Sequence, residues 1–147
     1  MLGRGLTLAM LLGLAACASV PLADSQADHE GKNFDPPARD SGALYVYRSG
    51  WFALARKVEV SLAGGARAEL GPNTYFRVEG PPGPIDLNCQ IDNANPAGRE
   101  LSIAPGETRF VQIEMVAGWM GPRCAVSEVP ADQGQAAVRG SKRVLPQ

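Results

Sequence analysis

The 147-residue chain lacks several features on which most enzymes and nucleic-acid-binding proteins depend. Its 14 basic and 15 acidic residues leave a formal charge of −1, whereas a nucleic-acid partner requires a basic surface. It has one histidine, His29, no Cys-x-x-Cys pair, no Gly-x-Ser-x-Gly motif and no glycine-rich phosphate loop between a strand and a helix. We therefore expect no nucleic-acid partner, no catalytic residues, no metal, no cofactor and no enzymatic activity.

Carboxylates are the remaining catalytic candidates. Eight are scattered through the expected strands and turns: Glu59, Glu69, Glu79, Asp86, Asp92, Glu100, Glu107 and Glu114. Two carboxylates that face each other across a cleft are what glycoside hydrolysis requires. Their scatter is better explained by the solvated faces of strands.

The longest apolar stretch near the start, residues 6–14, is too short to cross the ~30 Å hydrocarbon core of a bilayer as a helix. It follows Arg4 and precedes Ala15-Ala16-Cys17, an order typical of a signal peptide, here residues 1–16. Leu14-Ala15-Ala16-Cys17 resembles the lipobox of bacterial lipoproteins. That resemblance implies cleavage before Cys17 and attachment of acyl chains, such as palmitate, to it. The alternative is an ordinary secretory signal with a chance cysteine.

Ala18 bears on the destination of such a lipoprotein. Enterobacterial lipoproteins kept in the inner membrane usually carry Asp after the cysteine, so Ala18 implies sorting to the outer membrane. Several acyl chains on Cys17 would anchor the protein stably, on the periplasmic face. Residues 17–41 have almost no large apolar side chains, which predicts a flexible tether with a solvated His29.

From Gly42 onward the chain reads as all-β. Strand patterns begin near Ala43, Val58, Arg67, Thr74, Pro84, Arg99, Glu107 and Arg123. Turn signals such as Gly64-Gly65 and Pro105-Gly106 separate them. We predict a two-sheet β-sandwich, Ig-like or prealbumin-like, of about seven or eight strands over residues 42–130, with a small barrel as the alternative. Residues 131–147 are predicted to be a short helix or tail, with Arg139, Lys142 and Arg143 as solubilising charges.

The order of short motifs resembles a known family. These motifs are Ala43-Leu44-Tyr45-Val46-Tyr47-Arg48, the alternating Val58, Val60 and Leu62, Tyr75-Phe76, Gly83-Pro84-Ile85-Asp86-Leu87, and Pro105-Gly106-Glu107-Thr108-Arg109-Phe110-Val111. Over about residues 42–129 they resemble the domain of unknown function 2846, found in small bacterial lipoproteins. The family has no assigned activity, so the resemblance implies a fold and a location only. The chain departs from the pattern at Trp51-Phe52 and at its cysteine pair.

Cys89 and Cys124 are expected to form a disulfide. Cys89 shares a strand face with Leu87, and Cys124 shares one with Val126, so both are expected to point inward. An exported protein is in an oxidising compartment. No histidine is near enough in the sequence to activate a thiolate, and two cysteines with one tether histidine do not supply four zinc ligands.

Two apolar loops are candidate partner-binding sites. Trp51-Phe52 follows the first expected strand, and Trp119-Met120 follows the seventh, between glycines. Large aromatic residues in such loops are candidates for interface anchors, and the alternative is that they cap the ends of the core. If each strand reverses direction, both loops leave the same end of the domain and can form one apolar patch.

The sequence therefore predicts a non-enzymatic outer-membrane lipoprotein. It would be anchored through Cys17 and act as a periplasmic binding or scaffolding module, with an envelope protein or cell-wall partner. One alternative is an inhibitor of a cell-wall-degrading enzyme that uses the exposed loops. The other is a hydrolase with paired carboxylates.

Overall fold

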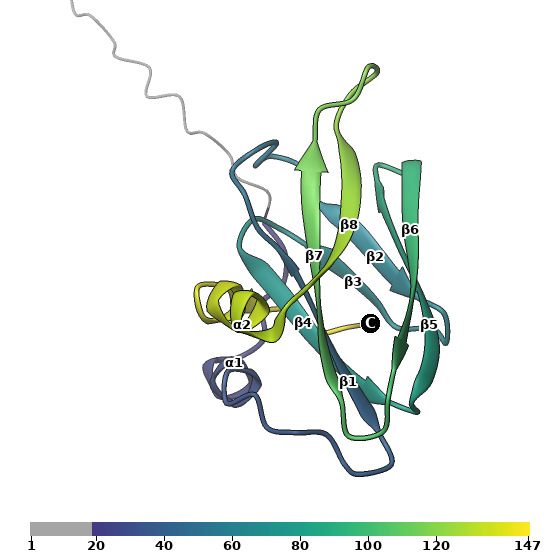
Figure 1. Ribbon diagram of the computed structural model, residues 1–147. Coiled ribbons are helices and arrows are strands. Elements are labelled where there is room, and N and C mark those ends of the chain that lie inside the picture. Colours follow the sequence, from purple (N-terminus) through teal and green to yellow (C-terminus); the bar gives the residue numbers. More distant parts are fainter. Residues whose placement is uncertain (1–18) are drawn as a thin grey trace, which may run out of the picture.

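The computed structural model describes residues 19–147 (Figure 1). The predicted signal peptide and the predicted lipidation site at Cys17 lie outside these residues. None of the helices in the described part of the chain is long and apolar enough to cross a membrane.

Two sheets form a sandwich, which confirms the predicted fold class, and the described strands do not close into a barrel. One sheet has five strands in the order β8-β7-β1-β4-β9, and the other has four in the order β3-β2-β5-β6. The strands are β1 Gly42–Arg48, β2 Val58–Leu62, β3 Arg67–Leu70, β4 Thr74–Gly80, β5 Gly83–Ile91, β6 Ala94–Ile103, β7 Thr108–Val116, β8 Arg123–Val129 and β9 Lys142–Arg143. Two helices, α1 Ser25–Gly31 and α2 Ala131–Arg139, complete the domain.

The main core lies between the sheets. In β2, Val58, Val60 and Leu62 are buried while the residues between them are half-buried, as their alternation predicts. They meet side chains of the five-stranded sheet such as Val46 and Ile113, which are fully buried. Full burial of such a side chain contributes about 1.5–3 kcal/mol, so this layer supplies much of the stability.

A second core lies on the outer face of the five-stranded sheet. The two helices cover this face, so β1 is buried along its whole length (Figure 1). The cluster consists of buried Tyr45, Tyr47, Tyr75, Phe110 and Val138, with Phe34, Val129 and Ala137 packed against them. The rings of Tyr45 and Phe110 stack with centroids 5.0 Å apart. The domain thus has three layers, of which the sequence predicted two.

The prediction of a flexible tether over residues 17–41 is wrong for its described part. Val20 belongs to the main core, and Asp24 caps α1 by accepting a hydrogen bond from the backbone of Ala27 (2.8 Å). The hydroxyl of Tyr45 donates to the carbonyl of Gly31 (2.8 Å). The composition of the segment suggested that it has no core of its own. It folds because it covers tyrosines that the sheet already presents. His29 is exposed, as predicted.

The short helix predicted within residues 131–147 is present as α2, and the residues after it are also built into the domain rather than forming a solubilising tail. β9 pairs in parallel with the start of β4, and the guanidinium of Arg143 donates to the carbonyl of Ala27 (2.7 Å). Arg139 lies over the ring of Phe34, 5.0 Å from its centroid. The sequence analysis predicted that Arg139, Lys142 and Arg143 are solvated charges. It could not show the backbone pairing of β9 with β4 or the contact of Arg139 with Phe34, because each of these joins segments that are far apart in the sequence.

The chain does not make a simple series of hairpins within one sheet. It passes from β1 to β2 and β3 in the other sheet, returns for β4, crosses again for β5 and β6, and returns for β7 and β8. As a result β1 lies beside β7 and runs parallel to it, with Arg48 opposite Ile113. This parallel pair positions the two apolar loops.

Candidate functional site

Large apolar side chains gather on two loops. Six large hydrophobic side chains are exposed in the described residues, and four of them are on the β1–β2 loop and the β7–β8 hairpin. Their exposed fractions are 82% for Trp51, 41% for Phe52, 102% for Trp119 and 91% for Met120. The alternative that the tryptophans cap the core is therefore wrong.

Both loops leave the same end of the sandwich, as predicted. β1 and β7 are parallel neighbours, so the loops that follow them start side by side, and the β7–β8 hairpin projects furthest (Figure 1). We call this end, with Trp51, Phe52, Trp119 and Met120, the aromatic end. Trp119 is 102% exposed, so the described residues do not cover it, and the aromatic end presents apolar surface to solvent from both loops.

A buried arginine shapes the β1–β2 loop. Arg48 is 1% exposed, and its guanidinium donates hydrogen bonds to the backbone carbonyls of Arg56, Ala53 (3.0 Å), Leu70 (3.3 Å) and Phe52 (3.5 Å). No carboxylate of the described residues pairs with it. Burial lowers the pKa of Arg48, yet an arginine remains charged at neutral pH. The buried cation thus holds the loop's backbone closed while leaving the tryptophan outside.

Glycines and the disulfide shape the β7–β8 hairpin. A Cβ added at Gly118 would lie 2.4 Å from the carbonyl oxygen of Gly121, so the close approach here requires glycine. At the base of the hairpin, Cys124 lies opposite Met115 and is joined to Cys89 of β5, with an S–S distance of 2.16 Å. The predicted pair is therefore brought together, and it ties the hairpin to the opposite sheet.

Charged side chains surround the aromatic end. Arg56 forms an ion pair with Asp92 of the β5–β6 turn, and Lys57 pairs with Glu69 at 3.2 Å. Arg123 is exposed at the start of β8, beside the hairpin. Exposed pairs of this kind contribute little stability, so the groups remain available to an external partner.

The structure brings some of the scattered carboxylates together. Glu59 lies opposite Glu69 on β2 and β3, and Asp86 lies opposite Glu100 on β5 and β6. Three of these four are exposed and Glu59 is half-buried. This agrees with solvated strand faces. Among the described residues, no group of three or more His, Cys, Asp or Glu side chains is arranged to hold a metal ion.

Two further carboxylates accept hydrogen bonds from the backbone. Glu79 accepts a hydrogen bond from the backbone N–H of Ala38 (2.9 Å), and Glu107 accepts one from that of Ala104 (2.7 Å). These bonds stabilise the ionised form and lower the pKa of both carboxyls. General acid catalysis needs the opposite shift, so neither group is suited to it.

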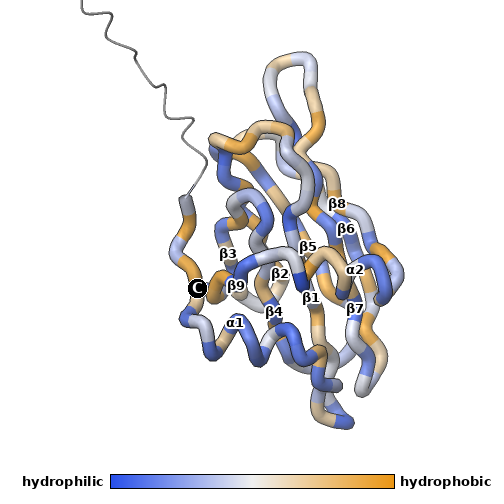
Figure 2. The backbone as a smooth tube through the Cα atoms, turned by 90° about the vertical axis from the view of Figure 1, so that its left-hand side faces the viewer, coloured by the Kyte–Doolittle hydropathy of each residue, from blue (hydrophilic) through white to orange (hydrophobic). Residues whose placement is uncertain are grey.

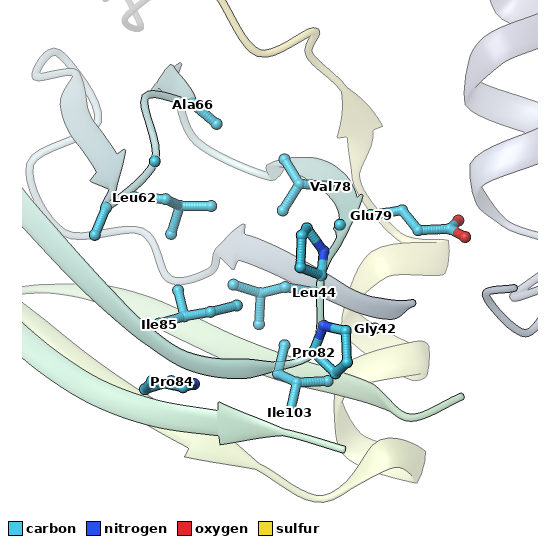
Figure 3. A pocket seen from close by; sticks show the side chains of 14 residues that line it. Gly42, Leu44, Leu62, Ala66, Val78, Glu79, Pro82, Pro84, Ile85 and Ile103 are labelled. Atoms are coloured by element: carbon cyan, nitrogen blue, oxygen red, sulfur yellow. The ribbon is translucent and has the colours of Figure 1, made fainter. Parts of the chain in front are cut away.

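A cavity of about 350 Å³ opens between the sheets at the end opposite the aromatic end. Its apolar lining includes Leu44, Leu62, Val78, Ile85 and Ile103 (Figure 3). The carboxylate of Glu79 points away from this space in Figure 3. The site is therefore suited to an apolar group and offers no chemistry of its own. Sequence analysis missed it, although apolar residues at the strand ends were a signal.

Comparison with known proteins identifies one relative without a known role. A protein of Haemophilus influenzae, described as an uncharacterized protein, is 22% identical over 135 residues, which cover 92% of this chain and 80% of that protein. No family model matches the chain.

Proposed function

We propose that the protein is an outer-membrane lipoprotein whose domain is a non-enzymatic binding or scaffolding module on the periplasmic side of the cell envelope. The observation that carries the proposal is the aromatic end. Tryptophans that are 82% and 102% exposed leave large apolar surface in water, which is unfavourable until a partner covers it. A buried arginine lies behind one loop and a disulfide lies beneath the other, so the fold holds both loops in place.

The sequence supports the lipoprotein part of the proposal. The lipobox-like Leu14-Ala15-Ala16-Cys17 supplies an anchor, and the resemblance to domain of unknown function 2846 fits the same location. The paired cysteines suit an oxidising compartment outside the cytoplasm.

One observation favours the inhibitor alternative. The β7–β8 hairpin projects beyond the sandwich with Trp119 near its tip, a shape that can enter an enzyme cleft (Figure 1). The hydrolase alternative has less support, because Glu59 and Glu69 lie side by side on one solvated sheet face rather than across a cleft.

Fatty-acid labelling tests the anchor. Cells that express the wild-type chain should incorporate a labelled fatty acid into the protein, and Cys17→Ser should abolish the label. Label retained in the variant would contradict lipidation at this cysteine. Fractionation of the labelled protein with outer rather than inner membranes tests its destination.

Site-specific crosslinking in cells tests the binding site. A photoreactive residue at position 119 should crosslink to an envelope component, while one at exposed Ser102, at the opposite end, should not. Capture of a cell-wall-degrading enzyme from position 119 would favour the inhibitor. Equal crosslinking from both positions would contradict a site at the aromatic end.

A further inference from the structure

We propose that the aromatic end lies against the phospholipid surface of the membrane that holds the anchor, with Trp51 and Trp119 inserted among the headgroups. The inference rests on the proposed lipidation of Cys17. It identifies the occupant of the aromatic end as a lipid bilayer.

The first step is the length of chain between the anchor and the folded domain. Val20 is 9% exposed and belongs to the main core, and the backbone of Ala23 donates to the carbonyl of Arg143 (2.9 Å). Only Ala18 and Ser19 separate Cys17 from Val20. A fully extended chain covers at most about 3.6 Å per residue, so Cys17 lies within about 11 Å of Val20. The domain is therefore held directly at the membrane surface.

The second step is which end of the domain meets the membrane. Ala23 bonds to β9, β9 pairs with Thr74 and Tyr75 at the start of β4, and Thr74 lies opposite Arg48 at the end of β1. The β1–β2 loop begins directly after Arg48. In Figures 1 and 2 the first described residues lie toward the aromatic end, and the chain then runs away from it to α1. The first described residues and the aromatic loops therefore lie toward the same end, and a lipid on Cys17 would hold that end at the membrane.

The third step is the chemistry of this end. Tryptophan has an apolar body and a polar N–H, and it is favoured at the boundary between lipid headgroups and acyl chains. Exposed Arg123 and Lys142 lie at the same end and can reach lipid phosphates while their stems stay apolar. Apolar side chains that project from two loops suit a fluid lipid surface, which adapts to their shape, whereas a protein partner would have to match that shape.

Tryptophan fluorescence tests the proposal directly, because the chain has two tryptophans and both are at the aromatic end. The lipidated protein is reconstituted into vesicles of phosphatidylethanolamine and phosphatidylglycerol. Lipids brominated on their acyl chains should quench most of the emission, the emission should shift to the blue, and aqueous acrylamide should quench it less than in detergent. Trp51→Phe and Trp119→Phe assign the signal to each loop.

A matched control places the reporter at the other end. Ser102→Trp in the Trp51→Phe and Trp119→Phe background should remain open to acrylamide and insensitive to brominated lipid. Its equal quenching by brominated lipid would overturn the orientation.

The outcomes separate this inference from the proposed function. A protein that carries no acyl chain and does not float with vesicles would overturn both. A protein that is acylated and floats, but whose tryptophans stay open to acrylamide, would overturn the orientation alone. If the tryptophans are protected from acrylamide only when an envelope protein is added, the proposed orientation is also overturned, and the aromatic end binds a protein instead.

Discussion

Removal of the Cys89–Cys124 bond is predicted to cost much of the stability of the domain. The bond joins β5 of the four-stranded sheet to β8 of the five-stranded sheet, across 35 residues of sequence. Closing a loop of this length in the unfolded chain stabilises the folded state by about 4 kcal/mol in the chain-entropy model. A single domain is typically stable by about 5–15 kcal/mol, so the loss is a large share of the total.

Replacing both Cys89 and Cys124 with alanine in the full chain isolates this contribution. Urea unfolding of the two proteins should show the midpoint lowered by about 2 M, given a slope of about 2 kcal/mol per M for a domain of this size. Reduction of the wild-type bond should produce a similar loss, which separates the crosslink from the packing of the two buried sulfurs. The slope should change little if both proteins unfold in one step.

Two results would refute the reasoning. Cys89 and Cys124 thiols that react freely in protein isolated from cells without reduction would show that the bond is absent. An unchanged midpoint in the double variant, with the bond shown to be formed in the wild type, would show that the crosslink does not restrict the unfolded chain as assumed.

Three further predictions concern other parts of the domain. Arg48→Met should destabilise the domain by about 2–4 kcal/mol in urea unfolding, because several backbone carbonyls lose a charged hydrogen-bond donor. Arg56→Met removes only an exposed ion pair and should cost less than about 1 kcal/mol. Gly134→Ala should destabilise the domain by about 1–3 kcal/mol despite the gain in helix propensity, because its Cβ would lie 2.3 Å from the ring of Phe110. Gly140→Ala is the matched control, because its Cβ would lie 3.6 Å from the nearest atom, the carbonyl oxygen of Ala137. Burial raises the pKa of all three tyrosines above 10.0, so stability should fall as pH rises above that value, and tyrosinate absorbance should develop together with unfolding.

The strands could be predicted because their signals are local. The alternation of Val58, Val60 and Leu62 marks one buried face, and Gly64-Gly65 marks the turn that follows, with both glycines at positive φ. The alternation of side chains along a strand also predicted that Cys89 and Cys124 both point inward, and the two are joined by a disulfide. These inferences needed only the pleat of a strand and the conformational freedom of glycine.

A short helix after Pro130 was predicted and is present as α2, but α1 and the packing of both helices on the sheet could not be predicted in the same way, because their partners are distant in sequence. α2 packs against β7 through Gly134, whose missing side chain makes room for Phe110. A glycine in a short polar helix is normally a sign against the helix. The one local signal for α1 was Asp24, a residue type that favours helix N-caps.

The aromatic end shows a different limit of sequence reasoning. Counting strand reversals placed both loops at one end, but only the parallel pairing of β1 with β7 makes them neighbours. The sequence also contained no sign that Arg48, which is 1% exposed, is the buried centre of the first loop. A charged residue is predicted to be exposed unless its partners are known, and here the partners are backbone carbonyls that composition does not reveal.

The two ends of the sandwich present apolar surface of opposite shape, and this bears on the proposed orientation. The aromatic end is convex, with exposed side chains on projecting loops, while the far end is concave, with a cavity of about 350 Å³ between the sheets. Projecting tryptophans suit a fluid lipid layer, and a concave apolar mouth suits a single apolar group. If the anchor holds the aromatic end at the membrane, the cavity faces the periplasm and remains open. Changes at Trp51 or Trp119 should therefore alter membrane contact without altering the lining of the cavity, since distant sites act independently.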